Sequence, residues 1–232
     1  MSPRGGGRLA AVLLGAVALG IGLLPRPVGA AEVPPFTGPR AGTPVAAVGD
    51  SLLGQLESEG PTHPRSLRAF TRSLQDEGWR ASVRPRNAWR VARVRLLADA
   101  ARARGAEVVV VSAGSGDVRW VREQDDPVAA RQASRRAAAR LLASLEEVCV
   151  VWPTVPLTGG AGERRTAAGL NAVLRSAAGP GVRVPEWAAA ATEHPGWFIG
   201  DRVHLSRSGE AAFQRVLLTA VRRCVREVAS VD

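Results

Sequence analysis

The chain has 232 residues, of which 46% are hydrophobic and 22% are charged, and its formal net charge is +10 at pH 7. This composition predicts one globular domain with a substantial core and excludes wholesale disorder. All 31 basic residues are arginines, and they are spread along the chain without a stripe that alternates with aromatic residues. We therefore expect no nucleic-acid binding, although the charge is consistent with weak attraction to anionic surfaces.

The N-terminus has the three parts of a secretory signal peptide. Arg4 and Arg8 precede an uninterrupted apolar run over residues 9–24, and small residues follow at 29–31. The run is shorter than the ~20 residues that span a bilayer comfortably. We expect residues 1–30 to be a cleaved signal peptide and the mature protein, with a net charge of +7, to be exported. An uncleaved N-terminal anchor, and with it a stable membrane attachment, is the alternative.

A proline- and glycine-rich lead over residues 31–43 is followed by a single domain over 44–232, in which apolar strands alternate with helices. Four consecutive valines, 108–111, are apolar on both faces, as in a parallel sheet that is covered on both sides. The pattern therefore predicts a doubly wound α/β fold with five strands. The predicted strands are 45–48, 81–83, 108–111, 147–156 and 182–184. After a helix that follows Ser51, the predicted helices are 66–78, 91–104, 127–145, 163–176 and 208–228.

The chain has two cysteines, Cys149 in an apolar strand and Cys224 on the apolar face of the last helix. In an exported protein an even number of cysteines favours a disulfide. The alternative is two buried free thiols in unrelated places. No histidine lies near either cysteine, so the sequence predicts no metal site, and nothing in it indicates a cofactor.

Polar residues follow the predicted strands at the edge where α/β proteins place their functional groups. Ser51 comes directly after the first strand, where it is consistent with a nucleophile and equally with a helix cap. Asp201 precedes His204 by three residues in a short loop, so its carboxylate can orient the ring and leave one ring nitrogen free to accept a proton. His63 and His194 lack such a partner, and structural or solvated roles suit them better.

These residues resemble the SGNH hydrolases, the GDSL-type lipases and esterases. The stretches "AVGDSL" and "GDRVHLS" match the two family motifs that carry the nucleophile and the Asp-x-x-His pair, and the resemblance covers residues 44–228. Within this family, the sequence most resembles exported actinobacterial members. The resemblance implies a flavodoxin-like three-layer sandwich with a five-stranded parallel sheet, and a catalytic triad of Ser51, His204 and Asp201.

The sequence departs from the family in the residues that bind the oxyanion. Gly116 stands where the family has an asparagine in Gly-x-Asn-Asp, and Ala88 stands at the position of a family glycine. A backbone amide still donates from Ala88, whereas Gly116 has no side-chain amide. Asn87, the Ser115 hydroxyl or a backbone amide are candidates for the missing donor, whose loss typically lowers turnover by about 10²–10³. Arg202 also replaces a residue that is commonly small.

Two functions follow from these observations. The first is an exported serine esterase that hydrolyses, or transfers, short acyl groups on small esters or on envelope carbohydrate or lipid, and that acts as a monomer. The second is an SGNH-like module without catalysis that binds an envelope glycan or a protein partner. Several tryptophans could line a ligand cleft or pack in the core, and Trp197 is the best ligand-side candidate because it shares the loop of His204. These tryptophans are Trp89, Trp120, Trp152, Trp187 and Trp197.

Overall fold

The computed structural model describes residues 33–38, 41–57 and 69–230, so the predicted signal peptide and His63 lie outside the described residues. Its centre is a five-stranded sheet in the order β2-β1-β3-β4-β5, and every adjacent pair is parallel. The strands are β1 Pro44–Gly49, β2 Arg80–Pro85, β3 Val108–Ser112, β4 Cys149–Val151 and β5 Val182–Arg183. This order is that of the flavodoxin-like fold, which confirms the predicted architecture.

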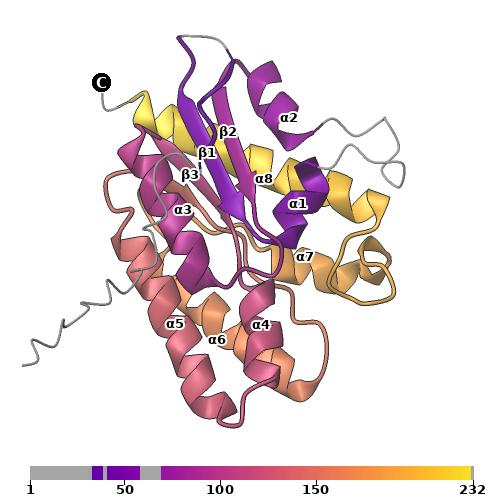
Figure 1. The fold of residues 1–232 in the computed structure, drawn as a ribbon. Coiled ribbons are helices and arrows are strands. Elements are labelled where there is room, and N and C mark those ends of the chain that lie inside the picture. The colour runs from indigo at the N-terminus through magenta and orange to yellow at the C-terminus, as the bar shows by residue number, and fades with distance from the viewer. Residues whose placement is uncertain (1–32, 39–40, 58–68, 231–232) are drawn as a thin grey trace, which may run out of the picture.

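Helices cover both faces of the sheet (Figure 1). They are α1 Ser51–Glu57, α2 Phe70–Asp76, α3 Val91–Ala103, α4 Ser115–Arg122, α5 Pro127–Ala143, α6 Ala161–Ala177, α7 Trp187–Glu193 and α8 Arg207–Val228, with a 3-10 turn at Pro195–Trp197. Helices α3, α5 and α6 pack on one face, whereas α1, α2, α7 and α8 pack on the other. None of the helices in the described part of the chain is long and apolar enough to cross a membrane.

The strands are buried on both faces, as their continuous apolar sequence requires. In β1, Val45 and Ala47 contact one helical layer, and Ala46 and Val48 contact the other, and all four are fully buried. Burying a valine side chain stabilises the fold by roughly 1.5 kcal/mol or more. Both helical layers therefore pack against β1. This packing fixes the position of the chain where it leaves β1 at the carboxyl end of the sheet.

Two helices were not expected from the sequence, α4 and α7. Helix α4 begins with Ser-Gly-Asp, a combination that favours turns, and it spans only eight residues. Helix α7 spans only seven residues, which is too short for a hydrophobic periodicity to be recognised in the sequence. The helix predicted over 66–78 is observed over 70–76, and residues 66–68 lie outside the described residues.

The lead before the first strand packs along the edge of the sheet. Val33 is 1% exposed and belongs to the core on the α3 side, and the Ser82 hydroxyl donates to the Pro34 carbonyl at 2.6 Å. Thr37 forms an antiparallel bridge with Ala81 of the edge strand β2. The lead therefore covers backbone groups of β2 that an open edge would leave unpaired.

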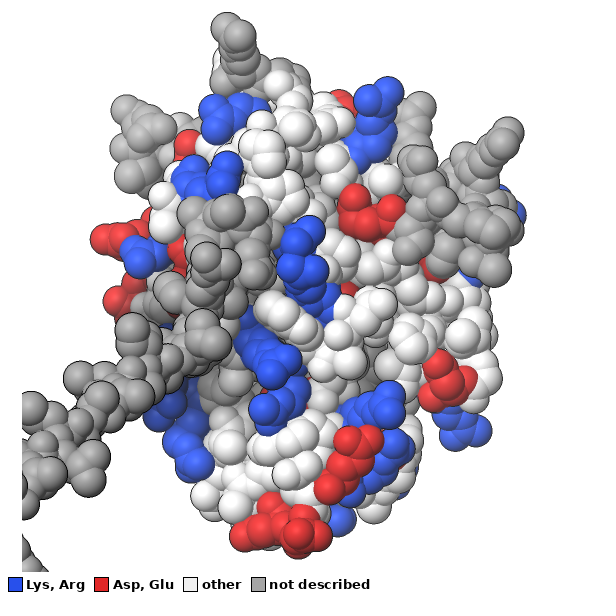
Figure 2. All heavy atoms as spheres, viewed as in Figure 1, with Lys and Arg blue, Asp and Glu red and all other residues white. Residues whose placement is uncertain are grey.

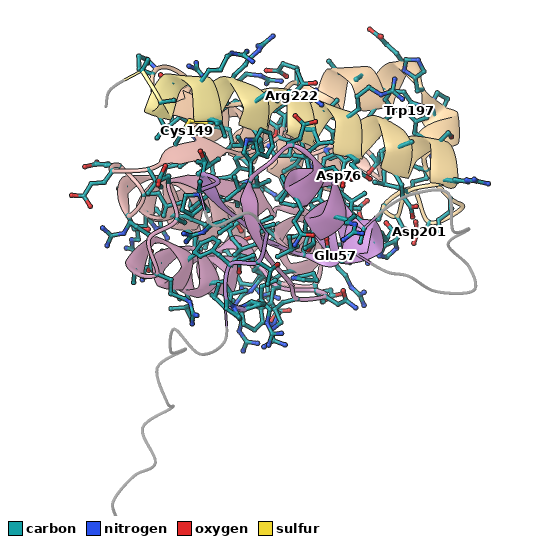
Figure 3. The ribbon with its side chains drawn as sticks, turned by 90° about the horizontal axis from the view of Figure 1, so that it is seen from above. Glu57, Asp76, Cys149, Trp197, Asp201 and Arg222 are labelled. Carbon is teal, nitrogen blue, oxygen red and sulfur yellow. A yellow bond between two sulfur atoms is a disulfide. The ribbon has the colours of Figure 1, made fainter. Side chains whose placement is uncertain are left out.

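A disulfide joins Cys149 of β4 to Cys224 of α8 across 75 residues, with Cα atoms 5.6 Å apart. Both residues are buried in the core layer between the sheet and α8. Cys149 lies under the C-terminal part of α8, at the opposite end of the molecule from Asp201 (Figure 3). The bond therefore fixes the far end of the helix that begins just after the predicted catalytic loop.

Replacing Cys149 and Cys224 with alanine should lower the free energy of unfolding by about 4 kcal/mol, because the bond restricts the unfolded chain over a long loop. Chemical denaturation of the oxidised wild type and of the double variant measures this difference. Wild type kept in a reducing agent is the control and should lose a similar amount. Equal unfolding free energies for oxidised and reduced wild type would contradict the prediction.

Candidate active site

Ser51 is the first residue of α1 and lies where the central strand β1 ends. The strand order changes direction between β1 and β3, and ligand sites of open α/β sheets collect at such a point. The backbones of β1 and β3 approach closely here, since a Cβ on Gly49 would lie only 2.3 Å from the Ser112 carbonyl oxygen. The glycine thus allows the strand pairing that places Ser51 at the carboxyl edge of the sheet.

The loop before α8 brings Asp201 and His204 to Ser51. The His204 Nε2 atom lies 3.1 Å from the Ser51 Oγ, and its Nδ1 atom lies 2.6 Å from the Asp201 Oδ2. The other Asp201 oxygen accepts the backbone N–H groups of Val203 and His204, each at 2.9 Å. Because an ionised carboxylate only accepts, this network assigns the proton to Nδ1 and leaves Nε2 to accept the Ser51 hydroxyl.

The Asp201 carboxylate is held in its ionised form. Partial burial raises its pKa, but hydrogen bonds from the His204 ring and from the backbone amides of Val203 and His204 outweigh burial, and the net pKa is below the ordinary value. At neutral pH an ionised Asp201 carboxylate therefore faces the Nδ1 atom of His204.

Aromatic stacking supports the same loop. The Trp197 ring lies parallel to the buried Trp187 ring, with centroids 5.2 Å apart, and parallel to the His194 ring, with centroids 4.0 Å apart. The His194 Nδ1 atom is hydrogen-bonded to the Ala190 carbonyl at 2.9 Å. His194 thus packs as a structural residue, and Trp197 lies at the same end of the molecule as Asp201 (Figure 3).

Gln55 joins α1, which begins at Ser51, to the loop that carries His204. Its side-chain oxygen accepts the Leu205 N–H at 2.9 Å, and its side-chain nitrogen donates to the Leu205 carbonyl at 3.2 Å. Gln55 lies one helical turn after Ser51, and Leu205 directly follows His204. Two hydrogen bonds therefore fix the relative positions of Ser51 and His204, which are 153 residues apart in sequence.

Asp50 lies behind Ser51 and is 1% exposed. Its carboxylate accepts the Leu52 N–H at 3.1 Å and the Ser115 hydroxyl. Burial raises the pKa of Asp50 to about 6, against the opposing effect of the hydrogen bonds from Ser115 and Leu52. The Ser115 hydroxyl, a candidate oxyanion donor from the sequence, is thus bound to Asp50 and ties the start of α4 to the turn that carries Ser51.

The loop between β2 and α3 fills the space in which the family asparagine would lie. A Cβ on Gly116 would be 2.6 Å from the Trp89 carbonyl oxygen and 3.3 Å from that of Ala88. Ala88 has a φ of 59°, a left-handed conformation that a glycine adopts more easily. The structure therefore explains why a glycine occupies position 116: the backbone of this loop lies so close that no space is left for a side chain.

The same loop contacts α1. A Cβ on Gly54 would lie 3.0 Å from the Asn87 Oδ1 atom, so the Asn87 side chain lies against the helix one turn after Ser51. The buried Asp117 carboxylate accepts the Val91 N–H at 2.7 Å and fixes the start of α3 to α4. The structure thus brings Asn87, Ala88 and Gly116 together where the β2–α3 loop contacts α1 and α4, and it places His204 and Asp201 at Ser51.

Sequence reasoning did not single out Gln55 or Asp50 as residues of the candidate site. Gln55 had a signal, since it follows Ser51 by four residues and so lies on the same face of the helix. Its partner Leu205 had none, because the contact forms through backbone atoms. Of the other predicted site tryptophans, Trp152 and Trp187 are core residues, and Trp89 and Trp120 are partly exposed.

A small pocket opens to solvent at the same edge of the sheet. Asp50 and Leu52, the two neighbours of Ser51, line one side, and residues 153–156 after β4 line another, with Trp187 and Phe213 behind. Within the described ranges, no group of three or more His, Cys, Asp or Glu side chains could hold a metal ion.

No protein-family model matches this chain, and no curated protein has a significant similarity to it. Its fold is similar to those of solved lipases and esterases. A lipase from a goat rumen metagenome matches with a TM-score of 0.58 and 15% identity, over 77% of this chain and 97% of the lipase. The acetyl xylan esterase AlAXEase has a TM-score of 0.59 and 15% identity, over 77% and 99%. A GDSL-like lipase from Bacteroides thetaiotaomicron has a TM-score of 0.55 and 14% identity, over 80% and 88%.

An asparagine at position 116, as in the SGNH hydrolase motif, should destabilise this protein. We expect Gly116→Asn to lower the free energy of unfolding by about 1–3 kcal/mol, because the new side chain must displace the backbone at Trp89. Gly162→Asn is the matched control, since nothing lies within 4 Å of a Cβ at Gly162. Denaturant titration compares the two variants, and an unchanged stability in Gly116→Asn would contradict the close approach.

Asp50 should make the stability of the protein depend on pH. Between the ordinary carboxyl pKa of 3.8 and about 6, the folded state holds a proton that the unfolded state has lost, so stability falls as pH rises through this range. Relative to Asp50→Asn, wild type should lose roughly 2 kcal/mol between pH 4 and pH 7. Denaturant titrations across this range measure the difference, with exposed Asp125→Asn as control. Parallel curves for wild type and Asp50→Asn would overturn the prediction.

Proposed function

We propose that this protein is an exported serine esterase of the SGNH type that removes short acyl groups from esters. One observation carries the proposal: the hydrogen-bonded series from the Ser51 Oγ to His204 and from His204 to Asp201, with distances of 3.1 and 2.6 Å. These separations are within the range that proton transfer between a nucleophile and its base requires. The similarity of the fold to solved esterases and lipases supports the same reaction class.

In the first step, the Ser51 oxygen attacks the ester carbonyl while its proton passes to the His204 Nε2 atom. Asp201 keeps the ring in this orientation and stabilises the imidazolium that forms. The tetrahedral intermediate collapses as His204 donates the proton to the leaving alcohol, and an acyl-serine remains. A water molecule, deprotonated by His204, then attacks the acyl-serine, and the acid is released as the proton returns to Ser51.

The negative charge on the carbonyl oxygen needs donors on the side opposite His204. In this proposal the backbone amides of Ser51 and Ala88 donate to it, and the side-chain amide of Asn87 takes the place of the absent asparagine. The position of Asn87 against Gly54 supports this assignment, since it keeps the amide next to the nucleophile helix. Each such donor contributes about 3 kcal/mol to transition-state stabilisation in related chemistry.

The small pocket beside Asp50 and Leu52 favours short acyl groups. Acetyl groups on envelope carbohydrate or lipid are the substrates that we propose, and one of the similar structures is an acetyl xylan esterase. Transfer of the acyl group to a sugar hydroxyl uses the same acyl-serine with another acceptor. The disulfide and the signal-like N-terminus support action outside the cytoplasm.

The nucleophile can be tested directly. Purified protein should be labelled by a fluorophosphonate probe and should hydrolyse a short aryl acetate, and Ser51→Ala should lose the label and at least about 10³-fold in rate. Ser176→Ala, a change of an exposed serine in α6, is the matched control and should retain both. Equal inertness of wild type and Ser51→Ala would remove the esterase proposal and favour a module that binds without catalysis.

A further inference from the structure

A row of arginines lies beside the candidate active site, and it consists of Arg84, Arg86, Arg90 and Arg93. These residues come from the end of β2, the loop that follows it and the first turn of α3. Figure 2 shows basic side chains down the middle of the face that bears the end of β2 and the junction of α3 with α4, while the larger acidic groups lie elsewhere on that face. The arginine row is therefore a local concentration of positive charge.

Aromatic rings hold three of these guanidinium groups in place. Arg86 and Arg93 lie over the Trp89 ring, at 5.6 and 6.0 Å from its centroid, and Arg90 lies 4.0 Å from the centroid of Trp120. Cation–π contacts of this kind restrict the otherwise mobile arginine side chains. A preorganised guanidinium loses less entropy when it binds an anion, so these arginines are suited to recognition.

The arginine row is directly connected to the oxyanion side of the site. Arg86 and Arg90 flank Ala88 by two residues on either side, and the loop between them contacts both α1, through Asn87, and Gly116. A substrate that extends from its ester carbonyl along the β2–α3 loop would therefore run past these arginines. The acidic group that faces Arg90 is Asp117, which is buried and hydrogen-bonded to the Val91 N–H.

The surroundings of the row distinguish between classes of anion. Of the large apolar side chains exposed in the described part of the chain, Leu96 follows the row by three residues and is only 37% exposed, so the row has little apolar surface that could insert into a lipid layer. Guanidinium groups cover the faces of Trp89 and Trp120, which removes the rings on which nucleic-acid bases would stack. A hydrophilic polyanion with carboxylates, the groups that a guanidinium binds with two parallel hydrogen bonds, fits best.

We propose that the arginine row selects acylated saccharides that carry carboxylate groups, so that uronate-containing glycans are the preferred substrates. This inference rests on the proposed esterase function and names its substrate class. The uronate carboxylate binds at Arg90 and Arg93 while the acyl ester on the same or the neighbouring sugar reaches Ser51. Recognition of this kind raises the rate by increasing the occupancy of the productive complex, and it weakens with ionic strength.

The test uses two esters of equal size, an O-acetylated methyl glucuronoside and the corresponding O-acetylated methyl glucuronamide. Wild type should hydrolyse the charged ester with about tenfold higher kcat/KM at low salt, and the preference should shrink in 0.5 M NaCl. Arg90→Gln/Arg93→Gln should lose most of the preference. Arg136→Gln/Arg140→Gln on α5 removes the same charge elsewhere and should keep it.

Binding separates this inference from the esterase proposal. Ser51→Ala protein, which cannot turn over substrate, should bind O-acetylated polygalacturonate several-fold more tightly than O-acetylated xylan, and the added Arg90→Gln/Arg93→Gln change should abolish the difference. Failure of catalysis with this binding preference intact would remove the esterase and retain the uronate site. Equal binding of the two polymers, or a preference that the arginine changes leave intact, would overturn the inference. Binding to vesicles of anionic lipid in its place would assign the row to a membrane surface and also overturn it.

Discussion

The site depends on the contact between Gln55 and Leu205. Ser51 follows the central strand, and His204 precedes the last helix, so no local structure holds the two residues together. The paired hydrogen bonds of the Gln55 amide use both backbone groups of Leu205, and this fixes the loop in translation and in rotation. A displacement of about 1 Å between nucleophile and base is enough to slow catalysis by roughly 10²-fold, so such a constraint has a direct chemical value. Asp201 then orients the His204 ring, and the stacked rings of Trp197 and Trp187 support the loop that Gln55 attaches to α1.

Much of the fold follows from local pattern. Strands β1 and β3 are continuous apolar runs, because both faces are covered by helices, and this signal is strong even in short segments. The disulfide between Cys149 and Cys224, favoured by the even number of cysteines and the expected export, is present in the structure. Helices α4 and α7 were missed because short helices depend on tertiary contacts more than on propensity. In α4, for example, the Asp117 carboxylate is engaged by the N–H of Val91 from another helix.

Ser51, His204 and Asp201 could be selected from the sequence as candidate site residues because they follow predicted strands or precede the last helix, and the structure brings them within hydrogen-bond distance. The oxyanion side could not, since it depends on how closely one backbone segment approaches another. Gly116 looked like the loss of a donor, whereas the structure shows that the carbonyl of Trp89 occupies the space that a side chain needs. The Ser115 hydroxyl was a candidate oxyanion donor, whereas in the structure it donates its hydrogen bond to the buried Asp50. Both differences arise from contacts between segments that are distant in sequence, which composition and periodicity do not encode.

The disulfide divides the candidate catalytic residues in a way that the folded structure conceals. It closes a covalent ring over residues 149–224, and this ring contains Asp201 and His204 but excludes Ser51. In the unfolded, oxidised chain Asp201 and His204 stay within a closed loop, while Ser51 separates from them. Only the return of β1 to its place between β2 and β3 brings Ser51 back to the edge of the sheet. Recovery of the site after denaturation therefore requires insertion of the central strand into the sheet. The covalent ring by itself contains only two of the three candidate catalytic residues.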